Sequence, residues 1–379
     1  MNTTEEKQMK NPLGYKSEKG LLFQFAVPSI IAMLVGSLYN IVDQFFIGHS
    51  VGELGNAATN ISFPLSISCV AIALLFGIGG ASAFNISMGA GEKKKAVYYL
   101  GNSAVMLFSC GIGLCVITLM FLEPLLHFFG SPNNVLDYAK TYTGIIAFGF
   151  PFLILTTGGG HLIRADGRPK VSMICNLTGA IINTFLDALF VFGLNMGMRG
   201  AALATIIGQI LSAIMVIWCL SHCKTVVIGK EHLRVSKKII SRIISLGTAP
   251  FSNQLAMMVV QIVMNKSLKY YGSISVYGEA VPIACAGIIT KVNQVFMSFV
   301  IGISQGLQPI TSFNYGAKKY KRVKTAYTFA IKCGFALAIV AFLLFQLVPR
   351  QIISIFGNGS EEYYTFAINY FHIFLFFTF

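Results

Sequence analysis

The sequence predicts an all-α polytopic membrane protein. Hydrophobic residues make up 55% of the 379 residues and charged residues only 11%, and the apolar residues occur in long blocks. A helix that crosses a hydrocarbon layer about 30 Å thick needs roughly 20 apolar residues. Ten blocks of about this length lie near residues 21–47, 57–88, 97–122, 138–162, 171–194, 200–221, 239–266, 277–312, 324–348 and 363–379. We therefore expect each block to form one membrane-spanning helix.

The positions of Lys and Arg predict how these helices are oriented. With the N-terminus in the cytoplasm, 21 of the 28 basic residues fall on the cytoplasmic side of the predicted spans. Basic loops stay in the cytoplasm during membrane insertion. The net charge of +14 therefore indicates orientation rather than a nucleic acid partner. We expect a multi-pass protein of the plasma membrane with a cytoplasmic N-terminus and no cleaved signal.

An internal repeat predicts how the helices are grouped. At an offset of 227 residues, "MGAGEKKK" (88–95) aligns with "YGAKKYKR" (315–322), so each half has a Gly-Ala turn and a basic cluster after its second span. Two halves with the same orientation predict two six-helix lobes related by a pseudo-twofold axis along the membrane normal.

This repeat also predicts the domain boundaries. We expect a cytoplasmic N-terminal segment (1–20), an N-lobe with helices one to six (21–222), a cytoplasmic linker (223–238) and a partial C-lobe with helices seven to ten (239–379). The offset aligns Phe379 with Phe152, midway through the fourth helix. The expected fold is thus a twelve-helix architecture of which this chain has about ten, as if truncated at the C-terminus.

Four ordered motifs resemble those of a known family. They are "LYNIVDQFFIG", "LIRADGRPK", "NTFLDALFVFGLNMGMRGAALAT" and "SFNYGAKKYKRVK". The chain resembles the multidrug and toxic compound extrusion (MATE) transporters from about Pro12 to its last residue. This resemblance implies twelve helices in two lobes around a central cavity, and export of organic cations in exchange for protons or sodium ions.

Two carboxylates, Asp43 and Asp187, lie well inside predicted spans. A charged side chain in lipid costs on the order of 3 kcal/mol or more, so both should face the protein interior. Polar residues share helix faces with them, and we expect three stripes to converge: Ser37, Asn40 and Asp43; Asn176, Asn183 and Asp187; Thr205, Gln209 and Ser212. Such a site could bind a proton or a sodium ion. Alternatively, each Asp makes only a buried hydrogen bond between helices.

The resemblance narrows this site to four residues. Asp43, Asn183, Asp187 and Thr205 match positions of the N-lobe cation site of MATE transporters. One position departs from some relatives, because Gly160 stands where they have Asn. The coupling ion, proton or sodium, therefore stays open.

Each half has one proline early in its first span. Pro28 removes one backbone hydrogen bond and permits a kink about four turns before Asp43; Pro250 is its counterpart. Protonation of Asp43 could favour a bent or a straight helix, which would couple the site to conformation. A static kink is the alternative.

The expected substrate cavity contains Asn40, Gln44, Met257, Gln261, Lys291 and Gln294. Met is adaptable and Gln forms hydrogen bonds without fixed charge, which suits varied ligands. Ordinary helix packing is the alternative for the Met residues. Lys291 is too far from either end of its block to reach the membrane surface, so we expect it to face the cavity.

Motifs typical of enzymes lack their structural setting. "GISQG" at 302–306 fits a nucleophile pattern, but it lies inside an apolar block, where no strand-turn-helix is expected. We interpret Gly302 and Gly306 as a helix-packing face. No nucleotide-binding loop and no zinc-ligand spacing occurs in the sequence, so we expect neither a cofactor nor a resident metal.

These observations favour a secondary active multidrug exporter rather than an enzyme. It would antiport amphipathic organic cations against protons or sodium ions by alternating access. The expected partners are small organic cations and membrane lipid, and the expected state is a monomer. A lipid-linked oligosaccharide flippase of the same superfamily and a non-transporting membrane scaffold are the alternatives.

Overall fold

The computed structural model describes residues 11–131, 133–275, 280–354 and 361–376, and within these ranges it contains helices but no β-strand. The long helices are α3 (Glu18–Ser50), α4 (Glu53–Gly89), α5 (Lys93–Met120), α7 (Asn133–Ala147), α8 (Phe150–Ala165), α9 (Pro169–Asp187), α10 (Gly197–Ser221), α11 (Lys237–Ser273), α12 (Ala280–Gly316), α13 (Tyr320–Leu347) and α15 (Glu361–Phe374). Short helical elements connect them: α2 (Pro12–Tyr15), α6 (Leu122–Phe128), η1 (Ala188–Gly193), η2 (Lys230–Leu233) and α14 (Pro349–Ser354).

These helices follow the ten apolar blocks. Seven of them, among the described residues, are long and apolar enough to cross a membrane, and a bent pair makes eight. The two remaining blocks correspond to α12 and α15; residues 277–279 and 377–379 of these blocks lie outside the described residues. The chain is thus a multi-pass helical membrane protein.

The fourth predicted span is not one straight helix. It consists of α7 and α8, which meet at an angle of 55°. The backbone N–H of Gly149 donates to Ile146 at 2.7 Å, so the last turn of α7 is tightened. Pro151 lies in the first turn of α8, where its missing N–H costs no helix hydrogen bond. The segment 138–162, predicted as one helix, is therefore divided into two helices by a bend, and the pair can still form one span.

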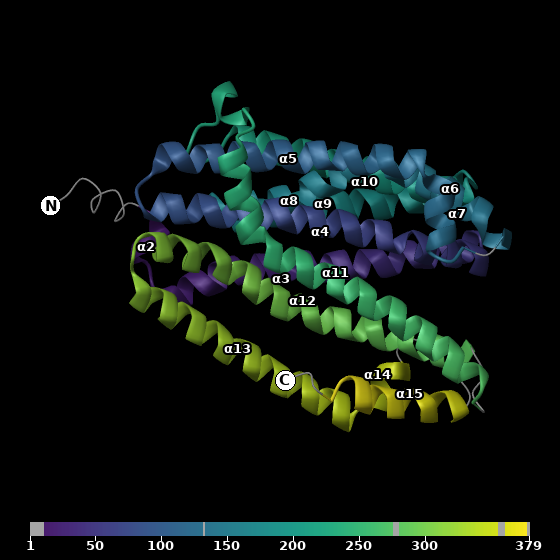
Figure 1. Ribbon diagram of the computed structural model, residues 1–379. Coiled ribbons are helices and arrows are strands. Elements are labelled where there is room, and N and C mark those ends of the chain that lie inside the picture. Colours follow the sequence, from purple (N-terminus) through teal and green to yellow (C-terminus); the bar gives the residue numbers. More distant parts are fainter. Residues whose placement is uncertain (1–10, 132, 276–279, 355–360, 377–379) are drawn as a thin grey trace.

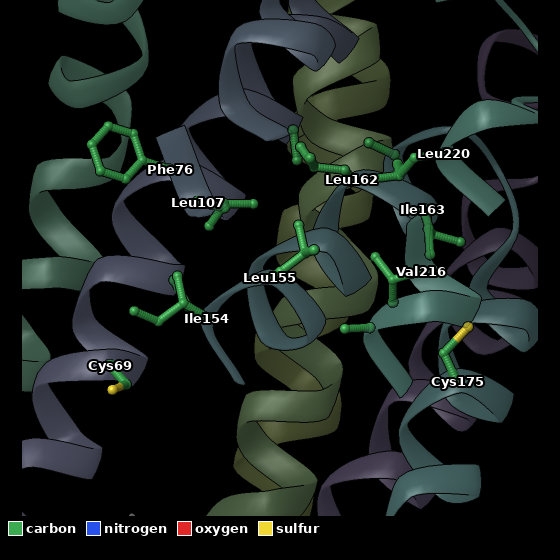
Figure 2. Close-up of a cluster of buried hydrophobic side chains, with 14 of the residues drawn as sticks. Cys69, Phe76, Leu107, Ile154, Leu155, Leu162, Ile163, Cys175, Val216 and Leu220 are labelled. Carbon is green, nitrogen blue, oxygen red and sulfur yellow. The ribbon is translucent and has the colours of Figure 1, made fainter. Parts of the chain in front are cut away.

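Helix α8 is the centre of the first group of helices. Nearly all of its side chains are buried, and it contacts α4, α5, α9 and α10. Figure 2 shows Ile154, Leu155, Leu162 and Ile163 of α8 among core side chains from these neighbours. A helix that is buried on all sides is apolar on all sides, which explains why this segment carries so few polar residues.

Helices α11 to α15 form a second group beside the first (Figure 1). Its own buried core includes Ile289, Phe345 and Phe371. Between the groups, a Cβ added at Gly302 or Gly306 of α12 would overlap the side chain of Ile30 or the backbone of Ala26 in α3. The interpretation of these two glycines as a helix-packing face is confirmed.

One end of the molecule collects the basic clusters. There Asn314 Nδ2 donates to the carbonyl of Leu13 at 2.9 Å, and Arg322 forms an ion pair with Glu18 at 2.9 Å. These contacts join α2 and the start of α3 to α12 and α13. At the same end, the segment after α10 lies on α5, because Asn102 Nδ2 donates to the carbonyls of His232 and Arg234, each at 3.1 Å.

A buried carboxylate fixes the segment after α10. Asp166, in the turn between α8 and α9, is fully buried and accepts from the backbone N–H of Lys224 at 2.7 Å and of Thr225 at 2.9 Å. Thr225 Oγ1 donates to the same carboxylate at 2.6 Å, and Arg168 Nε pairs with it at 2.8 Å. The "LIRADGRPK" motif thus holds the linker to the first group of helices.

Candidate functional site

Asp43 and Asp187 are brought together from two different helices. Asp43 lies in the last third of α3 and is 8% exposed, and Asp187 is the last residue of α9 and is 0% exposed. Helix α9 contacts α3 directly. Both carboxylates face the protein interior, as the cost of a charge in lipid predicts.

The backbone changes form immediately after Asp187. Residues Ala188–Gly193 form a π-helix, η1, which contacts both α3 and α10. Single turns of π-helix are rare and occur frequently at functional sites. Because the wider turn shifts the register of the side chains that follow, Asp187 lies at the junction of two helix geometries.

Asn183 and Thr205 extend the cluster by hydrogen bonds. With the Asn183 amide oriented to suit its neighbours, Nδ2 donates to Asp187 Oδ2 at 3.1 Å. The amide oxygen then accepts from Thr205 Oγ1 at 3.3 Å and from the Thr205 backbone N–H at 3.1 Å. Asn183 is 2% exposed and Thr205 is 6% exposed. The structure therefore brings all four predicted cation-site residues together.

The two carboxyl groups lie within hydrogen-bonding reach of one another. Oδ1 of Asp43 and Oδ1 of Asp187 are buried, and neither accepts a hydrogen bond from the described residues. Two ionised carboxylates so close to each other repel strongly in a poorly solvated site. A shared proton or a small cation between them would remove this repulsion and satisfy the open oxygens.

Two tyrosines that the sequence did not single out contribute to the electrostatics of this pair. The phenol groups of Tyr39 and Tyr142 both interact electrostatically with Asp43 and Asp187. Tyr39 lies four residues before Asp43, so helical periodicity could have placed it on the same face. Tyr142 comes from α7, and no sequence signal connects it to the site.

The three predicted polar stripes do not converge as a whole. Ser37 Oγ lies 3.1 Å from Ser298 Oγ of α12, and the exposed Asn40 donates to the carbonyl of Gly36 on its own helix at 2.8 Å. Ser212 donates to the carbonyl of Cys175 at 2.8 Å. A step of three residues is shorter than the roughly 3.6 residues of a helical turn, so polar side chains at such steps drift around the helix and contact different neighbours.

Asn176 also differs from the expectation. Its side chain donates to the carbonyl of Ser172 at 3.2 Å. An added Cβ at Gly160 would lie 3.7 Å from both the Asn176 amide nitrogen and Arg164 Nη1. The same Cβ would lie only 3.1 Å from Ser172 Oγ, to which Arg164 Nη1 donates at 2.9 Å, so the glycine packs closely against buried polar side chains.

The predicted cavity residues of the C-lobe lie on α11 and α12. Met257 is 50% exposed, Gln294 is exposed, and Gln261 and Lys291 are half-buried. In the N-lobe, Gln44 of α3 is half-buried. Pro28 and Pro250 lie inside α3 and α11, and both helices continue past them. A role in substrate binding stays a prediction for the cavity residues, and a kink stays a prediction for the two prolines.

Comparison with known proteins gives one consistent result. The model of the MatE family matches residues 28–189 and 251–379. The chain is 26% identical to a multidrug export protein, MepA, of Staphylococcus saprophyticus over 357 residues, which is 93% of this chain and 77% of the relative. It is 25% identical to MepA of Staphylococcus aureus over 358 residues, which is 93% of this chain and 78% of the relative.

A solved structure has the same fold. It is described as the outward-facing conformation of a multidrug resistance MATE family transporter of the MOP superfamily. Its TM-score is 0.87 at 20% sequence identity, and the match covers 100% of this chain and 82% of that chain. The two-lobe helical architecture predicted from the repeat is therefore confirmed.

Proposed function

This chain belongs to the MATE family, and from that premise we propose that it is a secondary active exporter that antiports amphipathic organic cations against protons or sodium ions. Its two lobes would open the central cavity alternately to the two sides of the membrane. Its relatives are multidrug export proteins, which supports drug-like cations as the substrate class.

The observation that carries this proposal is the buried carboxylate pair. Asp43 and Asp187 face each other inside the N-lobe, and Oδ1 of each has no partner among the described residues. When a coupling ion binds to the two carboxylates, it neutralises part of their negative charge. Their electrostatic attraction for an organic cation becomes weaker as a result. When the ion leaves, the attraction returns. Antiport requires such mutually exclusive occupancy.

The same residues can serve either coupling ion. A proton needs only the two carboxyl groups, which could share it. A sodium ion needs several oxygen ligands, and the carboxylates, the Asn183 amide and the Thr205 hydroxyl offer the oxygen ligands that hard cations prefer. The absence of a side chain at Gly160 removes one amide that some relatives have, so we favour the proton.

Movement would follow from the position of Asp43 on α3. Asp43 and Pro28 share this helix, and Pro28 interrupts its hydrogen-bond ladder. Binding or loss of an ion at Asp43 changes the electrostatic interaction between Asp43 and Asp187 of α9. This change would favour one bend of α3 over another. Substrate would contact Asn40, Gln44, Met257, Gln261, Lys291 and Gln294 in the cavity between the lobes.

The basic end of the molecule would face the cytoplasm of the plasma membrane. It carries most of the Lys and Arg residues, and such clusters remain on the cytoplasmic side during insertion. Export would then run from this end toward the opposite end.

The test is transport of a fluorescent organic cation by the purified chain in proteoliposomes. An imposed proton gradient should drive cation movement against the ion flux, and a sodium gradient of equal size should drive it less. Equal movement with either gradient and with none would refute coupled antiport.

A further inference from the structure

A cavity of about 470 Å³ lies at the basic end of the molecule. Its walls come from α2, the start of α3, the turn between α4 and α5, the turn between α8 and α9, and the segment after α10. Phe313 of α12 also lines it. The cavity therefore lies where the N-terminal segment, the first group of helices and α12 meet, and it is separate from the carboxylate pair.

Three lysine residues line this cavity. They are Lys16, Lys93 and Lys224. All three residues are exposed, and within the part of the chain that the structure describes none of their side chains forms an ion pair. The cavity thus has cationic groups with no protein anion bound to them.

The carboxylates in this region already have partners. Asp166, the one acidic residue among those that line the cavity, is fully buried and bound by Arg168 and by Lys224 and Thr225 backbone groups. Nearby, Glu18 pairs with Arg322 at 2.9 Å, and Glu92 pairs with Lys95 at 3.1 Å. The cavity is therefore net positive, and it attracts an anion.

The rest of the lining is partly polar and partly apolar. Asn11, Gln24 and Thr225 are polar, whereas Leu21, Phe25, Met88 and Phe313 are buried and present little surface to the cavity. The lining therefore suits a ligand whose binding depends on an anionic group.

We propose that this cavity binds a phosphate ester, with Lys16, Lys93 and Lys224 around the phosphate. A phosphate offers several acceptor oxygens, and lysine is a regular phosphate ligand. Either an anionic phospholipid of the adjacent leaflet or a soluble phosphate ester has this chemistry. The position of the cavity at the ends of the membrane-spanning helices favours the phospholipid.

A ligand here would join the two groups of helices. Lys16 follows α2, whose Leu13 carbonyl accepts from Asn314 of α12 at 2.9 Å. Lys93 and Lys224 belong to the first group of helices. A phosphate bound by all three therefore stabilises the arrangement in which the two groups meet at this end, and it opposes their separation there.

The proposal is tested by lipid binding to the full chain in detergent, measured by native mass spectrometry with phosphatidylglycerol as the probe. The test variant is Lys16→Gln, Lys93→Gln and Lys224→Gln together. The control is Lys94→Gln, Lys170→Gln and Lys230→Gln, which removes the same charge from exposed residues that do not line the cavity. Since a basic residue in contact with an anionic lipid contributes about fivefold, the test variant should bind about a hundredfold more weakly than the unmodified chain, and clearly more weakly than the control.

Equal affinities of the two triple variants would overturn the proposal. If the test variant does not fold, as judged by circular dichroism, the three single variants carry the test, each with an expected loss of about fivefold. A second arm adds glycerol phosphate as a soluble competitor. Displacement of the lipid at similar concentration identifies a soluble phosphate ester as the source, and failure to displace it identifies the phospholipid.

Discussion

Gly89 and Gly316 each lie against the backbone of the opposite lobe. A Cβ added at Gly89 of α4 would overlap the carbonyl oxygen of Phe313 in α12, and a Cβ added at Gly316 of α12 would overlap the carbonyl oxygen of Ile86 in α4. Gly89 and Gly316 are 227 residues apart, and so are Ile86 and Phe313. Residues 227 apart in the sequence therefore occupy equivalent positions in the two lobes, as the pseudo-twofold axis requires.

This reciprocal contact predicts a matched pair of effects. Gly89→Ala and Gly316→Ala should each destabilise the protein by about 1–3 kcal/mol, because a methyl group meets backbone that has little room to shift. Thermal unfolding in detergent measures this. Gly334→Ala in α13 is the control, because nothing lies within 4 Å of its added Cβ. Removal of a helical glycine there should stabilise by about 0.5–1 kcal/mol. A larger loss at Gly334 than at Gly89 would contradict the packing described.

Replacement of either carboxylate of the pair should abolish the coupling of export to the ion gradient but leave insertion into the membrane intact. Asp43→Asn and Asp187→Asn keep the side-chain shape and remove the titrating charge, so each should abolish gradient-driven export in proteoliposomes. The matched control is Asp137→Asn, an exposed acid on α7. Full gradient-driven export by both site variants would exclude the pair from coupling.

Asn183 is predicted to tune the affinity for the coupling ion. Asn183→Ala removes the donor to Asp187 Oδ2, and a hydrogen bond to a charged group contributes about 1.5–3 kcal/mol. Ion binding should therefore change about ten- to a hundredfold, as measured by the ion dependence of thermal unfolding. Thr184→Ala is the control, since its hydroxyl donates to Ala180 on its own helix. Identical ion dependence in the two variants would place Asn183 outside the site.

Asp166 is predicted to be a structural anchor. Asp166→Ala leaves the Arg168 guanidinium and two backbone N–H groups without their carboxylate. Removal of one partner from a buried charged network costs about 3–5 kcal/mol, so this variant should unfold at a lower temperature and accumulate to a lower level in membranes. Glu92→Ala, which removes an exposed pair with Lys95, should have little effect.

The orientation is predicted from labelling of substituted cysteines. Lys94→Cys and Lys170→Cys lie at the basic end, and Phe128→Cys lies in α6, at the opposite end, where Phe128 is 83% exposed. An impermeant maleimide added to intact cells should label only Phe128→Cys. Burial raises the pKa of native Cys223, after α10, to about 12, so its thiol reacts slowly at neutral pH. External labelling of Lys94→Cys would refute a cytoplasmic basic end.

The sequence by itself determined the membrane-spanning helices, the repeat and the two carboxylates that lie inside predicted spans. These follow from one-dimensional rules: a hydrocarbon layer needs about 20 apolar residues, and a carboxylate in lipid must face protein. Asp43 and Asp187 were therefore identifiable from isolated charges in apolar blocks. Gly302 and Gly306 were identifiable as packing residues because small residues four apart let helices approach closely.

Only the tertiary structure decided which side chains meet. The rotation of each helix is fixed by contacts with neighbours that are distant in sequence, so Ser37 faces Ser298 of α12 although it shares a predicted stripe with Asp43. The same contacts bring Tyr142 of α7 within electrostatic range of the carboxylates and bury Asp166 under the segment after α10. Local sequence rules cannot supply such pairs, because the partners belong to helices whose relative positions follow from the packing of the whole chain.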